Sequence, residues 1–265
     1  MYPIDLSGKR GVVFGVANQR SIAWAIAQAL HQAGARLAFA YQNERFKESV
    51  QKLTEPLGQP PAQTGGQPPL LECDVTDDAA VARVFDQLRE RFGGLEMVVH
   101  SIAYAQREHL GGRFSDVDRQ GFRTAMEISA YSLVPIARRA SELMAEGGSI
   151  LAMTFLAAER VFPGYNIMGT AKAALENEVG QLAAELGQQK VRVNAISAGP
   201  LDTLAARGIK GFLDMKHVYE ERSPLRRNIT HEEVAKAALF LLSDMSSGVT
   251  GEVLHVDAGY HITAL

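Results

Sequence analysis

Cysteine is almost absent from this chain. Cys73 is the only one among 265 residues, so no internal disulfide can form. A lone thiol in the apolar run 69–73 is expected to be buried and inert, which fits a reducing compartment. Long hydrophobic runs are missing too, since none approaches the roughly 18 residues that a membrane span needs. Residues 1–5 lack the basic start and apolar stretch of a signal peptide. These absences predict a soluble, cytoplasmic protein.

An excess of positive charge is missing as well. The chain has 27 lysines and arginines against 30 acidic residues, a net charge of −3, and its pI is near 6.2. Without a broad basic field, neither nucleic acid nor an anionic membrane is an expected partner. The composition, 46% hydrophobic and 22% charged, suits a single domain over residues 1–265 with a sizeable core. No metal site is expected.

Short apolar runs alternate with amphipathic stretches along most of the chain. The runs expected as buried strands are Arg10–Phe14, Arg36–Ala40, Leu70–Cys73, Leu95–Val99, Ser149–Met153, Arg192–Ile196 and Val253–Val256. The expected helices are Ser21–Gln32, Asp78–Phe92, Arg119–Ala145, Tyr165–Leu186 and Glu232–Leu242. Ser21 is the expected N-cap of the first helix, and a kink at Pro135 is expected in the third. The alternation predicts an α/β fold: a Rossmann-type, doubly wound sheet of seven mostly parallel strands with helices on both faces.

Two segments interrupt the alternation. Residues 58–69 are rich in Pro, Gly and Gln and are expected to form an exposed loop. Residues 198–230 contain helix-like pieces with weak periodicity, and a connection of that length is often a lid or a binding loop. We therefore expect a substrate-binding loop near 200–220. A surface excursion without a role is the alternative.

Tyr165 and Lys172 stand seven residues apart at the head of an Ala-rich stretch. Seven residues make nearly two helical turns, so both side chains are expected to leave the same face of a helix. A nearby ammonium stabilises a phenolate and makes proton donation by the phenol easier. Alone, this spacing is more typical of a solvated helix face. Combined with the nucleotide-binding pattern upstream, it predicts a reductase.

The nucleotide-binding pattern begins where the first strand ends. Gly15 closes that strand, and Ser21 and Ile22 open the following helix. Backbone N–H groups and the positive end of the helix dipole at such a turn can bind a diphosphate. Only one glycine of the usual G-x-G-x-x-G pattern is present, so an ordinary strand-to-helix turn is the alternative. Behind the fourth strand, Ile102 would pass near the cofactor's reactive ring, while His100 is expected to be structural.

Two more strand ends would meet the adenosine half of the same cofactor. Gln42 lies roughly twenty residues beyond the turn, where such folds contact the ribose, and it requires no phosphate there. This favours NADH, whereas Arg45 and Lys47 leave NADPH open. After the third strand, Asp74 and Val75 would hold the adenine; a plain helix cap is the alternative for Asp74.

Seven motifs follow one another as they do in a known family. They are Gly15-x5-Ser21-x-Ala23, Tyr41-Gln42-Asn43, Cys73-Asp74-Val75, His100-Ser101-Ile102-Ala103, Tyr165-x6-Lys172, residues 191–200 (VRVNAISAGP) and Gly251-Glu252-Val253-x-His255-Val256-Asp257. With these motifs the chain resembles the NADH-dependent enoyl-acyl-carrier-protein reductases of bacterial type II fatty acid synthesis, a divergent branch of the short-chain dehydrogenase/reductases. The resemblance covers all but the Pro/Gly/Gln-rich segment. The wider superfamily places its tyrosine and lysine four residues apart, so the spacing here is typical of the enoyl reductase branch.

The resemblance implies a homotetramer, a nicotinamide cofactor, and reduction of a trans-2-enoyl thioester on acyl carrier protein. By position it implies that Gly15, Ser21 and Ile22 hold the diphosphate, that Gln42 binds the adenosine ribose, and that Asp74 and Val75 hold the adenine. Ile102 would lie near the nicotinamide ring, and Lys172 would bind the nicotinamide ribose. The residues expected to line the diphosphate and the nicotinamide are Leu201, Thr203, Leu204 and Ala205. Ala105 and Phe155 would touch the substrate, and the segment 203–215 would close over the acyl chain. Arg226 and Arg227 are a candidate basic patch for the acidic carrier protein.

The chemistry implied by the resemblance is a conjugate reduction. Hydride would pass from the nicotinamide to the β-carbon of the enoyl thioester, and negative charge would collect on the thioester oxygen. A hydrogen-bond donor at that oxygen stabilises the transition state more than the ground state. Tyr165 is the expected donor, assisted by a ribose hydroxyl of the cofactor, and Lys172 would fix that ribose. The source of the α-carbon proton stays open.

Three positions depart from the family pattern. Phe155 stands where many members have a second active-site tyrosine; the mycobacterial branch also has phenylalanine there, so activity is still expected, without a proton role for this position. Asp202 stands where arginine is usual, and its carboxylate would repel a diphosphate unless it points away or is paired. Pro135 has no expected counterpart.

Two other functions stay open from the sequence alone. One is another NAD(P)-dependent carbonyl reductase or dehydrogenase, because the same fold and cofactor serve many substrates. The other is a nucleotide-binding protein without turnover. The spacing of Tyr165 and Lys172 and the segment 100–103 favour the enoyl reductase over the first. The presence of Tyr165 and Lys172 weighs against a protein without turnover. Phe155 and Asp202 are the only residues that would support that alternative.

Overall fold

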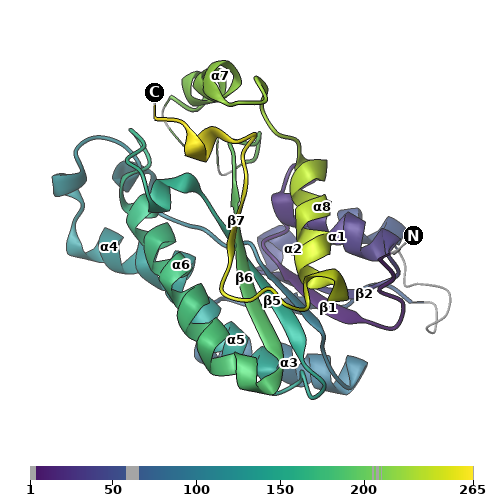
Figure 1. The fold of residues 1–265 in the computed structure, drawn as a ribbon. Coiled ribbons are helices and arrows are strands. Elements are labelled where there is room, and N and C mark those ends of the chain that lie inside the picture. Colours follow the sequence, from purple (N-terminus) through teal and green to yellow (C-terminus); the bar gives the residue numbers. More distant parts are fainter. Residues whose placement is uncertain (1–3, 58–65, 205, 207–208, 210, 265) are drawn as a thin grey trace.

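One parallel sheet forms the centre of the molecule (Figure 1). The computed structural model describes residues 4–57, 66–204, 206, 209 and 211–264. Within these residues, seven strands form a sheet in the order β3-β2-β1-β4-β5-β6-β7. Every neighbouring pair runs parallel. The doubly wound α/β fold predicted from the sequence is confirmed.

The strands coincide with the predicted apolar runs. They are β1 (Arg10–Phe14), β2 (Arg36–Tyr41), β3 (Leu70–Glu72), β4 (Met97–His100), β5 (Gly148–Thr154), β6 (Val191–Ala198) and β7 (Val253–Val256). Strands covered on both faces read as continuous apolar runs. Accordingly, every residue of β4 is buried, whereas every residue of β7, at one edge of the sheet, is partly exposed.

Helices cover both faces of the sheet. They are α1 (Ile22–Gln32), α2 (Glu44–Thr54), α3 (Asp78–Phe92), α4 (Arg119–Met126), α5 (Leu133–Ser141), α6 (Asn166–Leu186), α7 (Phe212–Arg222) and α8 (His231–Leu242). α3, α5 and α6 lie on one face, and α1, α2 and α8 lie on the other (Figure 1). Among the described residues, no helix has both the length and the apolar character that a bilayer crossing requires.

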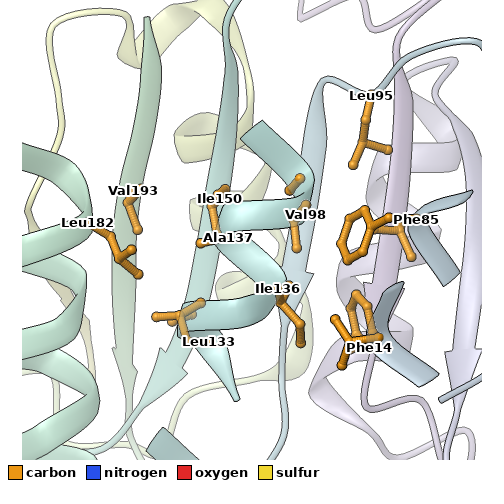
Figure 2. Close-up of a cluster of buried hydrophobic side chains, with 14 of the residues drawn as sticks. Phe14, Phe85, Leu95, Val98, Leu133, Ile136, Ala137, Ile150, Leu182 and Val193 are labelled. Carbon is orange, nitrogen blue, oxygen red and sulfur yellow. The ribbon is translucent and has the colours of Figure 1, made fainter. Parts of the chain in front are cut away.

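Two hydrophobic cores fill the space between the sheet and its helices. Figure 2 shows the core beneath α3, α5 and α6, where Val98 of β4 faces Ile136 of α5. Phe14, at the end of β1, stacks on Phe85 of α3 with ring centroids 6.5 Å apart. This packing fixes the end of β1 directly before Gly15, where the chain leaves the sheet.

The chain changes direction across the sheet at β1. β1, β2 and β3 follow one another toward one edge, whereas β4 returns to the opposite side of β1. Phe14 pairs with Ala40 on one side and with His100 on the other, so these three strands end side by side. In open α/β sheets, loops that leave such a switch point in opposite directions open a crevice that binds ligands.

The third predicted helix, Arg119–Ala145, is wrong as a single element. A π-helical turn over Glu127–Tyr131 separates α4 from α5. Proline lacks an N–H, and its ring crowds the carbonyl four residues before it, here that of Tyr131. The kink expected at Pro135 therefore appears as a widened turn before the proline.

α2 and α7 are missing from the predicted helices. α2 carries Phe46, Val50 and Leu53 at helical spacing, a signal that could have revealed it. α7 buries only Phe212 and Tyr219, so its amphipathic pattern is weak although it gives the stretch 198–230 an ordered helix. Of the predicted loop 58–69, residues 66–69 form no helix or strand, and residues 58–65 lie outside the described residues.

Candidate active site

A cavity of about 640 Å³ opens at the carboxyl edge of the sheet, and its walls are mainly apolar. The ends of β1 through β6 all contribute to it. Its wall includes these residues predicted to bind cofactor or substrate: Gly15, Ser21, Ile22, Gln42, Asp74, Val75, Ile102, Ala105, Phe155, Tyr165, Lys172, Leu201, Thr203 and Leu204. Ala205, predicted for the same site, lies outside the described residues. The structure thus brings together residues that are up to 189 positions apart, from Gly15 to Leu204.

The turn after β1 requires a glycine. Gly15 has a φ of 97°, in the left-handed region that side chains disfavour. A Cβ at this position would lie 2.0 Å from the backbone oxygen of Ser101. The turn after β1 and the segment after β4 therefore touch through their backbones, and both become walls of the cavity.

Ser21 is the N-cap residue of α1, as the sequence predicted, but its side chain makes no capping hydrogen bond. Its hydroxyl oxygen instead accepts from the N–H groups of Ala17 at 3.0 Å and Asn18 at 3.1 Å. The Ser21 hydroxyl oxygen therefore accepts from amides of the preceding loop and not from amides of the first helical turn. The helical ladder starts at Trp24, whose N–H donates to the Ser21 carbonyl at 3.0 Å. The amide of Ile22, ahead of that ladder, is a donor that a diphosphate can use.

Neighbouring helices hold the loop 16–20 in place. The Ser49 hydroxyl of α2 donates to the Ala17 carbonyl at 2.9 Å. His231, the first residue of α8, has its Nε2 2.9 Å from the Arg20 carbonyl. Because the loop is fixed by the protein itself, a ligand would not have to supply the free energy of ordering it.

The end of β3 supplies a carboxylate to the cavity. Asp74 Oδ1 accepts from the N–H and the hydroxyl of Thr76, at 3.0 and 2.8 Å. The N-cap of α3 is Asp77, whose Oδ1 accepts from the Ala79 N–H at 2.8 Å. The alternative of Asp74 as a plain helix cap is therefore wrong, and Asp74 is an exposed wall residue held by its own turn.

Tyr165 and Lys172 both line the cavity, although only Lys172 lies within α6. Tyr165 precedes α6 as its capping residue, and Asn166 after it has a φ of 36°, which turns the chain out of helical geometry. Lys172 lies within α6 with only 4% of its surface exposed, and its Nζ donates to the carbonyl of Met153 in β5 at 2.8 Å. The predicted helix Tyr165–Leu186 therefore begins one residue later, at Asn166, and both side chains still reach the same cavity.

Loss of water controls the protonation of this pair. Burial lowers the pKa of the Lys172 ammonium to about 8, while Glu176 acts in the opposite direction. Desolvation raises the pKa of the Tyr165 hydroxyl. The ammonium was expected to make proton donation by the phenol easier, but burial is the effect that sets the pKa of Tyr165, and it raises that pKa. Tyr165 is a neutral phenol, which makes it a hydrogen-bond donor.

An aromatic row connects Tyr165 with α7. The Phe155 ring centroid lies 5.0 Å from that of Tyr165 and 4.8 Å from that of Phe162. Phe162 lies 6.4 Å from Tyr219 of α7, which stacks on Tyr260 at 3.7 Å. Phe155 thus shapes the cavity and supports the phenol through ring contacts, without a hydroxyl of its own.

Asp202 does not face the cavity. Its neighbours Leu201 and Thr203 are wall residues and Asp202 is not. Its Oδ2 lies 3.8 Å from Nζ of Lys216 in α7. The carboxylate is paired outside the cavity, so the repulsion of a diphosphate that the sequence suggested does not apply.

Several wall residues were missed by the sequence reasoning. They include Phe46 of α2, Tyr104, Arg107 and Leu110 behind β4, and Ile128, Met153 and Met168, whereas Phe212 and Met215 of α7 belong to the predicted segment 203–215. The helical spacing in α2 could have pointed to Phe46. The remainder arrive through tertiary packing, for which the local sequence offers no signal.

His100 and Cys73 take no part in acid–base chemistry. His100 is fully buried, with Nε2 2.8 Å from Ser132 Oγ. Burial lowers its pKa to about 3, which keeps the ring neutral. Burial also raises the pKa of the Cys73 thiol to about 12, so no reactive thiolate forms.

The site suits a nicotinamide dinucleotide. It offers a backbone donor at a helix start for a diphosphate, a carboxylate and an amide for the adenosine half, and a lysine and a tyrosine at the far end. In the described ranges no group of three or more His, Cys, Asp or Glu side chains is arranged to hold a metal ion. Fold and site together define a dinucleotide-dependent oxidoreductase.

Comparison with known proteins narrows this class to one family. The family model described as enoyl-(acyl carrier protein) reductase matches residues 15–261. The chain is 50% identical to the enoyl-acyl-carrier-protein reductase (NADH) FabI of Bacillus cereus, over 97% of this chain and 98% of that protein. It is 48% identical to the enoyl-acyl-carrier-protein reductase (NADPH) FabI of Staphylococcus aureus, over 97% and 98%. The crystal structure of the Bacillus cereus enoyl-acyl carrier protein reductase with NADP⁺ and indole naphthyridinone matches with a TM-score of 0.94 and 50% identity, over 98% of this chain and 99% of that one. This chain therefore belongs to the enoyl-(acyl carrier protein) reductase family.

Gly15→Ala should disrupt both the turn after β1 and the cavity that this turn borders. The left-handed φ costs about 1–2 kcal/mol, and the clash with the Ser101 backbone about 1–3 kcal/mol more. We expect a lower thermal unfolding midpoint and loss of dinucleotide binding in a fluorescence titration. Gly180→Ala is the matched control, because a Cβ there meets open space and alanine favours a helix. An unchanged unfolding midpoint for Gly15→Ala would contradict the proposed backbone contact.

Proposed function

We propose that this chain reduces trans-2-enoyl-acyl-carrier-protein thioesters to saturated acyl thioesters by hydride transfer from NADH. One observation carries the proposal: Tyr165 and Lys172 border the same largely apolar cavity as the diphosphate-binding turn at Gly15. Family membership supports the substrate class, because similar proteins carry the name enoyl-acyl-carrier-protein reductase. The sequence alternatives, a carbonyl reductase and a protein without turnover, have no observation in their favour.

Tyr165 stabilises the charge that the reaction creates. The nicotinamide, when bound, supplies a hydride to the β-carbon of the substrate. Negative charge then develops on the thioester oxygen, and the Tyr165 hydroxyl donates a hydrogen bond to it. The raised pKa of Tyr165 keeps its proton in place while the charge develops. In a mainly apolar cavity, such a bond is far stronger than it would be in solvent.

Lys172 holds the sugar next to the reacting ring. Its ammonium has three donors, and one of them meets the Met153 carbonyl. This contact aims the remaining donors into the cavity, where they can bind ribose hydroxyls. Gly15, Ser21 and Ile22 would hold the diphosphate.

The ribose end of the cavity favours NADH over NADPH. Gln42 is neutral and can bond ribose hydroxyls. Lys47, a candidate partner for an additional phosphate, has its Nζ 3.0 Å from the Glu44 carboxylate. A carboxylate beside the ribose repels a phosphate. NADPH stays open as a second donor through the exposed Arg45, and the Staphylococcus aureus relative is named for NADPH.

The proposal includes a single domain, a carrier-protein-bound substrate, a homotetramer and a cytoplasmic location. α7 supports the substrate-binding segment near 200–220, because Phe212 and Met215 line the cavity. The partly exposed edge strand β7 supports assembly, since natural sheets rarely leave such an edge uncovered. The basic patch at Arg226 and Arg227 has less support, because Arg227 is bound at 2.6 and 2.9 Å to the Glu233 carboxylate.

The proposed function is tested by following the absorbance of NADH with short and long trans-2-enoyl thioesters, and with a panel of ketones and aldehydes. We expect consumption of NADH with the enoyl thioesters and slower consumption of NADPH. Oxidation with the carbonyl panel alone would assign a different reductase activity. Binding of NADH without consumption in the presence of either panel would indicate a protein without turnover.

Tyr165→Phe should lower kcat by about 100-fold or more, the usual effect of removing a donor from a developing oxyanion. The dissociation constant of NADH should change by less than about twofold, because the phenol contacts the substrate side of the cavity. Tyr131→Phe, which removes a hydroxyl from an exposed tyrosine, is the control. Full activity of Tyr165→Phe would remove Tyr165 from the mechanism.

The affinity for NADH should depend on pH through Lys172. Its ammonium is charged below its pKa of about 8 and loses the proton above it. The dissociation constant should therefore stay level below pH 8 and rise above it, by about tenfold once the charged hydrogen bond is lost. In Lys172→Met the dissociation constant should already be high at neutral pH and should not change across this range. Titrations at a series of pH values measure this, and an identical pH profile in both proteins would refute it.

Asp202→Asn should leave the affinity for NADH within about twofold of the original. Its carboxylate pairs with Lys216 outside the cavity, and exposed ion pairs contribute about 0–1 kcal/mol. Calorimetric titration of both proteins at low salt checks this. Tenfold tighter binding by Asp202→Asn would mean that the carboxylate faces the diphosphate.

A further inference from the structure

Asn166 occupies a strained position directly behind Tyr165. Its φ of 36° lies in the left-handed region, which asparagine tolerates better than most residues. Gly164, on the other side of Tyr165, also has a positive φ, of 83°. The backbone around Tyr165 is therefore bent on both sides. This bend places Tyr165 as the residue before α6, with φ and ψ of −98° and −26°.

The Asn166 side chain reaches a different wall of the cavity. Its Nδ2 donates to the Gly111 carbonyl at 2.9 Å and lies 3.4 Å from the Gly112 carbonyl. Arg107 and Leu110, in the same segment, line the cavity. Asn166 thereby connects the backbone of Tyr165 with a wall contributed from behind β4.

Leu110 of the segment 107–112 packs against a small buried cluster that includes Ile167 and Met168 of α6. Gly112 has a φ of 71°, and a Cβ on Gly111 would meet open space, so these glycines do not restrain it by packing. A second anchor is the buried His109, whose ring lies so close to Gly121 at the start of α4 that a Cβ there would be 2.1 Å away. His109 holds the segment to α4, and Asn166 holds it to Tyr165.

We propose that Asn166 is a positioning residue that fixes the orientation of Tyr165 and couples it to the wall segment 107–112. The inference rests on the proposed role of Tyr165 as donor to the substrate. Asn166 acts in two separable ways. Its backbone accepts the left-handed φ that aims Tyr165, and its amide holds the Gly111 carbonyl that keeps Leu110 at the cavity.

Three substitutions separate these two effects. Asn166→Ala removes the side-chain amide and disfavours the left-handed φ, whereas Asn166→Gly removes only the amide. Asn166→Asp keeps a residue that tolerates the left-handed φ, but it replaces the donor with an acceptor that repels the Gly111 carbonyl. We expect Asn166→Ala to lower kcat by about 10- to 100-fold, as a misplaced catalytic group does. Asn166→Gly should restore most of kcat but keep a raised KM for the enoyl thioester, and Asn166→Asp should also raise KM. NADH affinity should stay within about twofold in all three.

The decisive experiment makes Asn166→Ala in a protein that already carries Tyr165→Phe and measures its effect on kcat there. If Asn166 acts through the phenol, Asn166→Ala should lower kcat by less than about threefold there, since coupled residues are not additive. Asn177→Ala, at an exposed asparagine further along α6, is the matched control and should behave as the unchanged protein.

Specific results would overturn the inference. Equal losses of kcat in both backgrounds, a parallel loss of NADH affinity, or wild-type kcat and KM in both Asn166→Ala and Asn166→Gly would each refute positioning by Asn166. Asn166→Gly keeps the test valid if Asn166→Ala fails to fold. A wild-type protein that does not consume NADH with enoyl thioesters would instead refute the proposed function itself, and this inference with it.

Discussion

The backbone contact between the turn after β1 and the segment after β4 is the constraint on which the site depends. β1 and β4 pair in parallel up to Phe14 and His100, and Gly15 then passes so close to Ser101 that no side chain fits. Beyond this contact, one segment runs toward α1 and the other toward the loop that carries Ile102 and Ala105. The cavity opens where these two segments separate.

Exclusion of water determines what the catalytic pair can do. Burial at this mainly apolar cavity raises the pKa of Tyr165 and lowers that of Lys172. A neutral phenol is a better donor to a developing oxyanion than a phenolate, which has no proton to donate. Lys172 remains charged near neutral pH because Glu176 partly offsets its burial. The aromatic row from Phe155 to Tyr260 completes this environment and connects it to α7.

The departures from the family pattern are explained by contacts that only the fold creates. Asp202 pairs with Lys216 of α7. Lys216 lies fourteen residues further along the chain, and no local sequence pattern indicates that the two side chains are close. Phe155 stands where many relatives have tyrosine, and its ring packs at a tilt against that of Tyr165, so it contributes by packing. In both cases the side chain makes a structural contact at the border of the cavity, which is compatible with the role proposed for Tyr165.

The order of strands and helices could be predicted because buried parallel strands have a recognisable apolar pattern. Many of the wall residues predicted by resemblance, such as Gly15, Gln42 and Asp74, lie just after the ends of those strands, where topology places them. What failed was local geometry. The Ser21 hydroxyl bonds its own loop and not the helix it precedes, Pro135 acts on the turn before it, and the left-handed Asn166 makes α6 begin one residue after Tyr165. Each outcome depends on backbone angles or on competition for one hydrogen bond, which spacing alone does not encode.

The most direct test of the account follows the hydride. NADH carrying deuterium at both C4 positions of the nicotinamide is incubated with the protein and a crotonyl thioester, and the product is examined by NMR. If the cavity aligns the ring with the conjugated acyl chain, one deuterium appears at the β-carbon of a butyryl thioester. Deuterium on the former carbonyl carbon, or none in the acyl product, would contradict the account.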